Sequence, residues 1–276
     1  MKNRVFFTLV ERAAKQWWFY LILTLLFFIP AYTTQPFKSQ ETPKLVIEVL
    51  SHSLIYNVSF IFPLFKLIPL VVIALLVARP KLFTPVFYAW AALNLMLLAI
   101  FQNMANTPTY GFSLLIGNMI IYTFTSLLFC WAAFYLKEPF QFEKLPWWRY
   151  WVVPLAMLAF WFPVNTSLAI SIPDFAPAGL FLNEAGLTTC MMLPVYLAVL
   201  TLASSGVDAS VLRIAGFIGA VTGLLNVTEF FMNASYGWWL GVVHLPLLLI
   251  SIYTFVLGIR KPFHQALPKI LVSDAK

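Results

Sequence analysis

Four polar side chains in an apolar stretch of the sequence have the spacing of one helix face. Thr222, Asn226, Glu229 and Asn233 follow one another at intervals of four, three and four residues. On a helix turning about 100° per residue they fall within an arc of about 60°. Hydrocarbon cannot solvate amides or a carboxylate, so the stripe must face other protein or a water-filled cavity. The pattern predicts either hydrogen bonds between neighbouring helices or a site at which Glu229 anchors a ligand.

His244 stands about two turns into the next apolar stretch. A short connection joins the two stretches, so we expect Glu229 and His244 at similar depth on adjacent antiparallel helices. A glutamate–histidine pair can transfer protons, either in coupled transport or in acid–base catalysis. The alternative is a single core histidine bonded to a backbone carbonyl, and both interpretations stay open at this point.

Lys66 is a cation in the middle of a third apolar stretch. It stands about eight residues inside, which corresponds to roughly 12 Å of helix. A lysine at that depth is costly unless it is paired or lies in a wet cavity. We therefore expect it to pair with a carboxylate, either Glu229 or Glu184.

The elements that must position these residues are membrane helices. Of the 276 residues, 62% are hydrophobic and 10% are charged, whereas soluble proteins have about 45–50% and 25%. This composition excludes a disordered chain and a disulfide-rich scaffold. Apolar stretches close to 20 residues, the length that crosses a bilayer, predict an integral, multi-pass protein. We expect the protein to be embedded in the lipid bilayer of the plasma or inner membrane, or of another internal membrane.

We expect an all-α fold with eight transmembrane helices and both termini in the cytoplasm. The helices are expected over residues 17–34, 58–78, 84–103, 112–136, 149–164, 186–205, 211–232 and 237–258. This topology places nearly all of the 17 lysine and arginine residues on the cytoplasmic side, with only Lys38 and Lys44 outside, as the positive-inside rule requires. The net charge of +7 then reflects orientation and attraction to anionic lipid, and no nucleic-acid partner is predicted.

The two halves of the chain repeat several short patterns. An aromatic tetrad begins at Trp17 and again at Trp147, 130 residues later (147 − 17), and an apolar-proline pair recurs at Pro69 and Pro194, 125 residues apart (194 − 69). This steady offset predicts two parallel four-helix repeats, 1–141 and 142–276. Asn118 and His244, each seven residues after a glycine, then occupy equivalent positions and mark a difference between the repeats.

The remaining segments and motifs restrict the possible functions but supply no further candidate site residues. Residues 43–57 and 173–184 are expected to form short interfacial elements that can cap a cavity. Cys130 and Cys190 fall at opposite membrane depths and are not expected to pair. Walker A, GxGxxG and HExxH patterns are absent, so the sequence predicts no metal site, assigns no catalytic residue and leaves any cofactor unidentified.

Three functions fit these residues. We favour binding or transport of a small apolar or amphipathic ligand at an outer-side site between the two repeats. The residues expected to contact that ligand are Glu229, Asn226, His244, Asn118, Lys66, Asn233 and Glu184. The alternatives are a membrane-embedded enzyme that modifies a lipid or isoprenoid through Glu229 and His244, and a non-catalytic subunit whose aromatic side chains contact partner membrane subunits.

Overall fold

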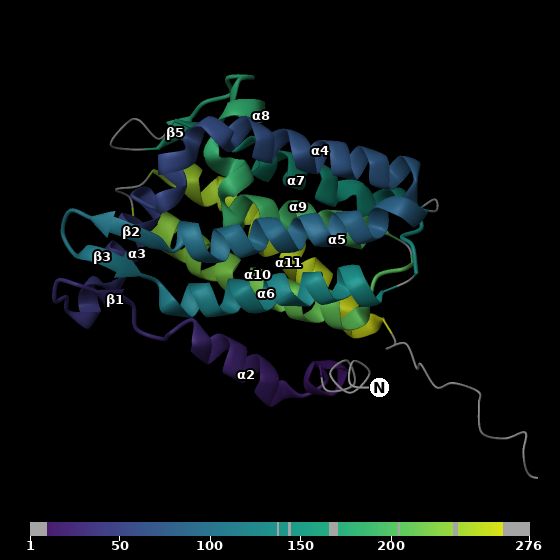
Figure 1. Cartoon of the computed structure of the whole chain (residues 1–276), viewed down its shortest axis with the longest axis horizontal. Helices are drawn as coiled ribbons and strands as arrows, with labels where there is room; N and C mark the ends of the chain where they lie inside the picture. The colour runs from purple at the N-terminus through teal and green to yellow at the C-terminus, as the bar shows by residue number, and fades with distance from the viewer. Residues whose placement is uncertain are drawn as a thin grey trace, which may run out of the picture.

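The computed structural model describes residues 10–136, 138–142, 145–165, 171–203, 205–233 and 237–261. The chain is mostly helical, at 75% (Figure 1). Within the described residues, five helices are long and apolar enough to cross a membrane: Leu54–Ala78, Pro80–Gln102, Ile116–Tyr135, Ala209–Met232 and Trp238–Arg260. Their length and composition support the predicted class, a multi-pass membrane protein.

The five long helices are built as follows. The first joins the 3-10 helix η2 (Leu54–Ile61) to α4 (Phe62–Ala78), and the second joins α5 (Pro80–Leu97) to a π-helical turn, η3 (Leu98–Gln102). The others are α6 (Ile116–Tyr135), α10 (Ala209–Met232) and α11 (Trp238–Arg260). The shorter helices are α2 (Trp17–Leu26), η1 (Ser39–Glu41), α3 (Thr42–Ser51), η4 (Trp147–Trp151), α7 (Val152–Trp161), α8 (Gly179–Leu182), η5 (Glu184–Leu187) and α9 (Thr189–Leu202).

Each of the eight expected spans contains a helix, but three of those helices are short. Helix α2 ends at Leu26, well before the expected residue 34, and α7 ends at Trp161. Phe162 follows α7 in a left-handed conformation, with φ of 51°, and Pro163 then prevents the helix from continuing. The count of eight spans stays a prediction, as does the orientation, for which Lys2, Arg4, Lys137, Lys144, Lys269 and Lys276 lie outside the described residues.

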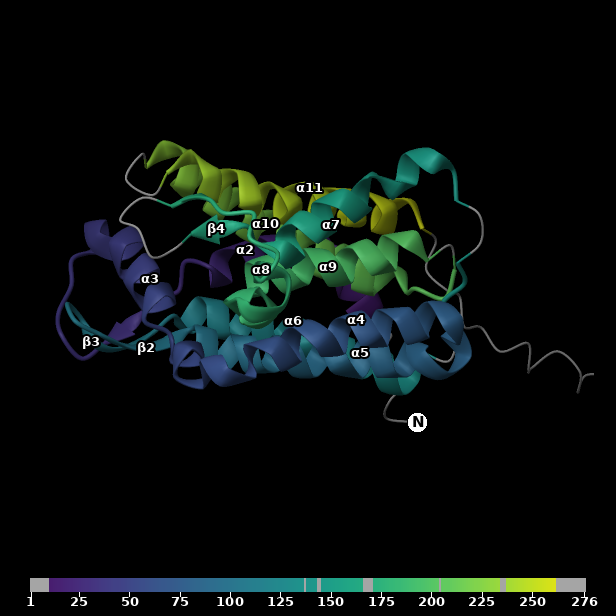
Figure 2. The ribbon, with the colours of Figure 1, turned by 90° about the horizontal axis from the view of Figure 1, so that it is seen from above.

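Helix α9 lies in the centre of the molecule and is nearly enclosed by protein. Its residues from Thr189 to Thr201 are all buried, and it packs against α5, α7, α10 and α11 (Figure 2). The segment Gly179–Leu187 precedes it at an angle of 97°, as a broken span or a re-entrant segment. Thr188, at the break, is extended, which ends one helical segment before the next begins.

A small β-sheet covers one end of the helices. Strands β2 (Met104–Thr107) and β3 (Gly111–Leu114) form an antiparallel hairpin, and β1 (Tyr32–Thr33) pairs with β3 on the other side. Gly111 adopts a φ of 65° at the end of the turn, which a residue with a side chain rarely adopts. The sequence did not predict this hairpin. Because the hairpin occupies residues 104–114, the helix of the fourth expected span begins at Ile116 and not at residue 112. A second pair of strands, β4 (Val164–Asn165) and β5 (Ile172–Pro173), lies at the same end.

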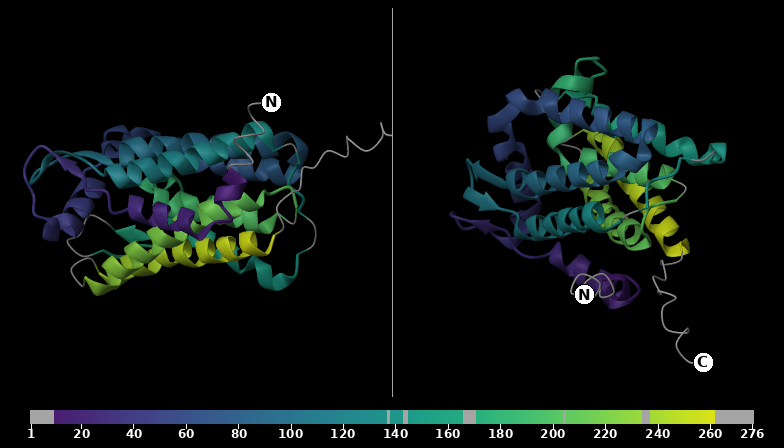
Figure 3. Two further views of the ribbon diagram at one scale, coloured as in Figure 1. Left: turned by 90° about the horizontal axis from the view of Figure 1, so that it is seen from below. Right: turned by 45° about the vertical axis from the view of Figure 1, so that its right-hand side comes forward.

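Helices α10 and α11 form the closest helix pair. Helix α10 presents Gly216 and Gly223 to the backbone of α11, where an added Cβ would lie 2.6 Å from Phe255 N and 2.7 Å from Leu248 Cα. Helix α2 lies outside this pair, between α6 and α10 (Figure 3), where the Tyr20 ring contacts the rings of Phe217 and Phe255. The glycines turn one face of α10 toward α11, which leaves its polar stripe to face elsewhere.

Candidate functional site

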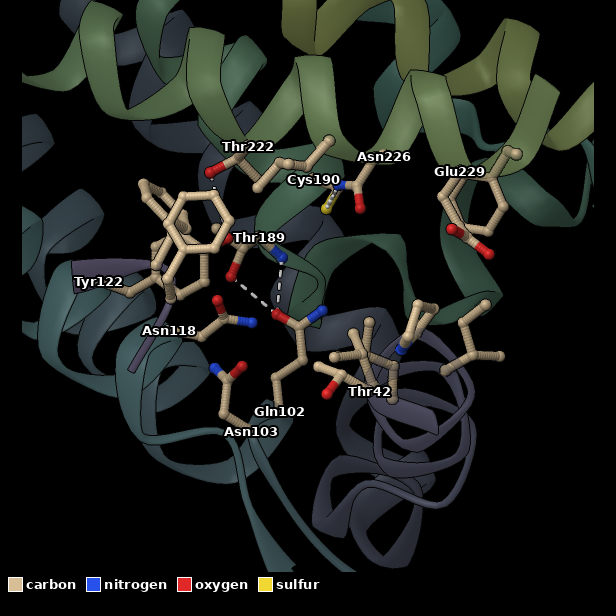
Figure 4. A pocket seen from close by; sticks show the side chains of 18 residues that line it. Thr42, Gln102, Asn103, Asn118, Tyr122, Thr189, Cys190, Thr222, Asn226 and Glu229 are labelled. Atoms are coloured by element: carbon tan, nitrogen blue, oxygen red, sulfur yellow. Dashed lines mark hydrogen bonds between the residues drawn. The ribbon is translucent and has the colours of Figure 1, made fainter. Parts of the chain in front are cut away.

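The polar stripe of α10 faces a cavity of about 330 Å³ between the two halves of the chain. Helix α6, the end of η3, the start of α9 and helix α3 form its other walls (Figure 4). The polar lining residues are Thr42, Gln102, Asn103, Asn118, Tyr122, Thr189, Cys190, Thr222, Asn226 and Glu229, and the apolar ones are Phe27, Phe28, Pro43, Val46, Ile47, Leu50, Leu225 and Phe230. The cavity is thus lined by both polar and apolar side chains, which come from elements far apart in the sequence.

Three of the four predicted stripe residues line this cavity. The Thr222 hydroxyl donates to Ile218 O at 2.9 Å and is hydrogen-bonded to the Tyr122 hydroxyl at 3.3 Å. Asn226 Nδ2 donates to Cys190 Sγ at 3.0 Å, which leaves its Oδ1 without a partner in the described structure. Glu229 is half-buried, and its Oε1 accepts from Asn233 Nδ2 at 3.5 Å. Asn233 itself stands just after the helix, so it supports Glu229 from outside the cavity lining.

The end of the α5–η3 helix supplies two buried amides. Gln102 Oε1 accepts from both the backbone N and the hydroxyl of Thr189, at 2.9 and 2.7 Å, and so caps the first turn of α9. Asn103 Nδ2 donates to Leu98 O and Ala99 O, the first carbonyls of the π-helical turn. Asn103 Oδ1 is buried and has no hydrogen-bond partner. Such an acceptor is costly to leave unsatisfied and calls for a donor in the adjoining space.

Acceptors outnumber donors among the unused polar groups of the cavity. Asn118, from α6, makes no hydrogen bond to any residue that the structure describes, and it lies beside Asn103 (Figure 4). The unused acceptors among the described residues are Asn103 Oδ1, Asn118 Oδ1, Asn226 Oδ1 and the Oε2 of Glu229, whose Oε1 already accepts from Asn233. The unused donors are the amide groups of Asn118 and Gln102. A molecule that donates hydrogen bonds fits this arrangement better than an anion does.

His244 does not line the cavity, although the sequence analysis placed it in the site. Its side chain is buried in α11, where Nδ1 is hydrogen-bonded to Leu240 O at 2.7 Å and the ring lies 4.6 Å from the ring of Phe230. No hydrogen bond joins it to Glu229 within the described part of the chain. The expected proton-transferring pair is therefore not formed, and the core-histidine alternative describes the observed geometry.

The expected pairing of Lys66 with Glu229 is wrong. Lys66 is fully buried, and its Nζ donates to Phe160 O and lies 4.4 Å from the centre of the Phe160 ring. Its position against the last turn of α7 lets the cation satisfy a carbonyl at the negative end of that helix. Glu184 lies near enough for an electrostatic interaction with Lys66 but forms no hydrogen bond with it in the described structure.

The end of α7 is therefore a second polar cluster, separate from the cavity. Asn183 Nδ2 donates to Trp161 O at 2.7 Å and to Phe162 O at 3.2 Å, and Trp239 Nε1 donates to Pro163 O at 2.7 Å. Together with Lys66, these side chains supply donors to four successive carbonyls at and just beyond the end of α7. Lys66 and Glu184 belong to this cluster, which has the character of a helix cap.

The structure thus brings together Asn118, Asn226 and Glu229, with Asn233 behind them, and it separates them from His244, Lys66 and Glu184. The residues expected to contact the ligand did not include five that line the cavity: Gln102, Asn103, Tyr122, Thr189 and Cys190. The adjacent amides of Gln102 and Asn103 at the end of an apolar stretch were the available signal. Thr189 and Cys190 reach the cavity only because the chain breaks before α9, which no sequence pattern indicated.

Within the described ranges, no group of three or more histidine, cysteine or acidic side chains is arranged to hold a metal ion. Both cysteines are free thiols, as the sequence analysis expected. Comparisons of this chain with protein-family models, with curated proteins and with solved structures found no match.

Proposed function

We propose that the protein binds, and carries across the membrane, a small amphipathic molecule whose polar end donates hydrogen bonds. The observation that carries this proposal is the cavity of about 330 Å³ in which unused acceptors face an apolar wall. Its volume lies in the range of sites for small organic molecules. It is too small for a whole membrane lipid and large enough for a compact amine or alcohol with a short apolar part.

The polar end of the ligand would lie against the amides and the apolar part against α3 and the end of α2. Asn103, Asn118 and Asn226 offer carbonyl oxygens on one side, and Glu229 adds a negative charge at the half-buried edge. Val46, Ile47 and Leu50 from α3, with Phe27 and Phe28, supply the apolar wall. A protonated amine can donate hydrogen bonds to the amide oxygens and also pair with the negative charge of Glu229.

Transport, rather than binding alone, is favoured by the break before α9. Discontinuous helices with a terminus in a central cavity are a recurrent feature of secondary transporters, because the open backbone groups and movable half-helices can serve a substrate there. Here the first residues of α9, Thr189 and Cys190, line the cavity, and the segment before them is bent by 97°. This interpretation uses the predicted topology, in which the cavity opens toward the outer side between two repeats.

The two alternative functions have weaker support. The enzyme required Glu229 and His244 as an acid–base pair, and only Glu229 lines the cavity. The subunit interpretation relied on exposed aromatic and aliphatic side chains, which a multi-pass protein needs for contact with lipid in any case. Neither alternative accounts for the unsatisfied oxygen of Asn103.

Binding can be tested with the full-length protein in mild detergent by native mass spectrometry. The probes are decylamine, decanol and decanoate, which share the alkyl chain and differ in the polar end. We expect decylamine to bind best, decanol less well and decanoate least. Because a hydrogen bond to a charged group contributes about 1.5–3 kcal/mol, Glu229→Gln is expected to weaken decylamine binding by roughly tenfold or more and to leave decanol little affected.

The matched control is Glu41→Gln, which removes a carboxylate at the same end of the molecule outside the cavity. It is expected to bind all three probes as the wild type does. Equal binding of decylamine by the wild type, Glu229→Gln and an Asn118→Leu/Asn226→Leu double variant would overturn the site. Uptake of radiolabelled decylamine by proteoliposomes, lost in Glu229→Gln, separates transport from binding.

A further inference from the structure

A second, smaller cavity lies at the opposite end of the molecule and is lined by cations. Its volume is about 230 Å³, and it lies where η4, the end of α9, the start of α10 and the end of α11 meet (Figure 2). Arg149, Arg260 and Lys261 line it together with the Thr201 side chain. The remaining wall is apolar, from Leu200, Leu212 and Leu257. This site shares no residue with the cavity described above.

Within the described residues, no ion pair neutralises the cations of this cavity. Arg149 Nε is buried and has no hydrogen-bond partner, although its guanidinium lies 5.5 Å from the Trp148 ring. Arg213, which lies nearby on α10, donates to Gly258 O and Ile259 O and so caps α11. Asp208 is the carboxylate whose charge reaches both Lys261 and Arg213. Among the described residues, three lining cations therefore stand against the single carboxylate of Asp208.

The charge of Lys261 is likewise only partly balanced by Asp208. Burial lowers the pKa of its ammonium group, and the charge of Asp208 opposes that shift only in part. A half-buried ammonium group beside a buried guanidinium N–H without an acceptor leaves two donors that an oxyanion can satisfy together. A phosphate group offers several acceptor oxygens, and arginine binds it with two parallel hydrogen bonds.

The surroundings of Arg149 place this cavity at the level of the lipid headgroups. Trp147 is 86% exposed, and Trp148 and Tyr150 are about half exposed. Tryptophan and tyrosine gather at the membrane–water interface, where an apolar ring and a polar edge are both accommodated. The cavity also lies at the end of the molecule that the charge pattern predicts to face the cytoplasm, where anionic lipids attract basic residues.

We propose that this cavity binds the phosphate group of an anionic membrane lipid. The headgroup phosphate lies between Arg149 and Lys261, with Arg260 at the rim, and the apolar wall of Leu200, Leu212 and Leu257 contacts the glycerol and the first carbons of the acyl chains. The lipid joins η4 to the end of α11, two elements that also pack together through Trp151 and Tyr253. This inference is independent of the function proposed for the larger cavity.

The test measures lipid retention by the full-length protein with native mass spectrometry after titration with phosphatidylglycerol, phosphatidylcholine or inorganic phosphate. Phosphatidylcholine has the same phosphate diester but no net charge. We expect phosphatidylglycerol to be retained at least about tenfold more tightly than phosphatidylcholine, because the quaternary ammonium of choline is repelled by the three lining cations. Inorganic phosphate, which lacks the apolar part, is expected not to compete at millimolar concentration.

The variants separate a built site from general attraction to a basic surface. Arg149→Gln/Lys261→Gln removes two cavity cations, and Arg12→Gln/Lys81→Gln removes two exposed cations that do not line it. We expect the first pair to lose the preference for phosphatidylglycerol and the second to keep it. Lys261→Gln alone, which keeps the buried Arg149, is expected to give an intermediate loss and provides a measurement if the double variant does not fold.

Two results would overturn the proposal. Equal loss of phosphatidylglycerol in both double variants would show that surface charge alone attracts the lipid. Displacement of the bound lipid by inorganic phosphate, with no preference between the two lipids, would assign the cavity to a soluble phosphate compound instead.

Discussion

At the scale of single residues, Lys66 is a buried cation that caps the end of a helix and does not contact the ligand cavity. Its depth in the sequence pointed to a carboxylate partner, but its Nζ meets a backbone carbonyl of α7. The last carbonyls of a helix have no partner within that helix, and the negative end of the helix dipole favours a positive charge. A fully buried lysine is consistent with this arrangement without any catalytic role.

We expect Lys66→Met to destabilise the protein by about 1–3 kcal/mol, the cost of a buried acceptor that loses its donor. The free energy of unfolding can be measured by reversible denaturation in mixed micelles. Leu67→Met, at the neighbouring exposed position, is expected to change it by less than about 0.5 kcal/mol. Binding of decylamine should be unchanged in Lys66→Met. If that variant lost the amine while remaining folded, Lys66 would belong to the ligand site after all.

The sequence could predict only those residues of the candidate site whose spacing places them on one face of a single helix. Thr222, Asn226 and Glu229 share a face of α10 because of their spacing, and the structure keeps them on one wall. Asn103 and Thr189 join them through tertiary contacts between segments 86 residues apart (189 − 103). Periodicity along one helix carries no information on such contacts, so sequence reasoning could flag Gln102 and Asn103 but not place them.

At the scale of elements, the glycines of α10 determine how closely that helix approaches α11. An added side chain at position 223 would meet the backbone of Leu248 at 2.7 Å. Backbone atoms cannot move aside as a flexible side chain can, so the two helices must separate. Because the polar stripe lies on the same helix, a displaced α10 also displaces Asn226 and Glu229.

We therefore expect Gly223→Leu to lower the free energy of unfolding by roughly 1–3 kcal/mol or more and to weaken decylamine binding together with stability. Leu224→Phe adds bulk at the next residue, which is exposed, and is expected to leave both properties near those of the wild type. Thermal unfolding and native mass spectrometry on the same samples provide both measurements. Wild-type behaviour of Gly223→Leu would mean that α10 and α11 are less closely packed than described here.

Element ends were harder to predict than element existence. The sequence indicated a helix in each of eight segments, and each segment contains one. Composition could not show that α2 stops at Leu26, because Phe27, Phe28 and Ile29 are as apolar as the helix itself, and no pattern marked the extended Thr188 before α9. The β2–β3 hairpin was missed for a related reason. Its four-residue strands are short and lie where only a connection was expected.

At the scale of the whole molecule, the charges are distributed unevenly between the two ends. Arg79, Lys81, Arg149, Arg213 and Arg260 stand at helix ends on one side, whereas Glu48, Asp174, Glu184 and Glu229 lie toward the other, with the sheet and α3 (Figures 1 and 2). A bilayer with an anionic cytoplasmic leaflet orients such a molecule with its basic end inside. The predicted duplication and the count of eight spans are not tested by this asymmetry.

Orientation can be tested by cysteine labelling in cells, in a Cys130→Ser background. Lys38→Cys lies at the end predicted to be outside, and Lys81→Cys at the end predicted to be inside; both positions are exposed. We expect a membrane-impermeant maleimide to label position 38 in intact cells and position 81 only after permeabilisation. The reverse pattern would invert the topology and place the larger cavity on the cytoplasmic side.

The burial of α9 has a consequence for the order in which the chain can assemble during synthesis. With 14 residues it covers about 21 Å at 1.5 Å per residue, less than the roughly 30 Å of hydrocarbon that a span must cross. It cannot insert alone, and two of the helices that enclose it, α10 and α11, are made after it. A nascent chain that has not yet reached Arg260 must therefore hold its central helix incompletely enclosed, and α10 and α11 complete the enclosure once they are synthesised.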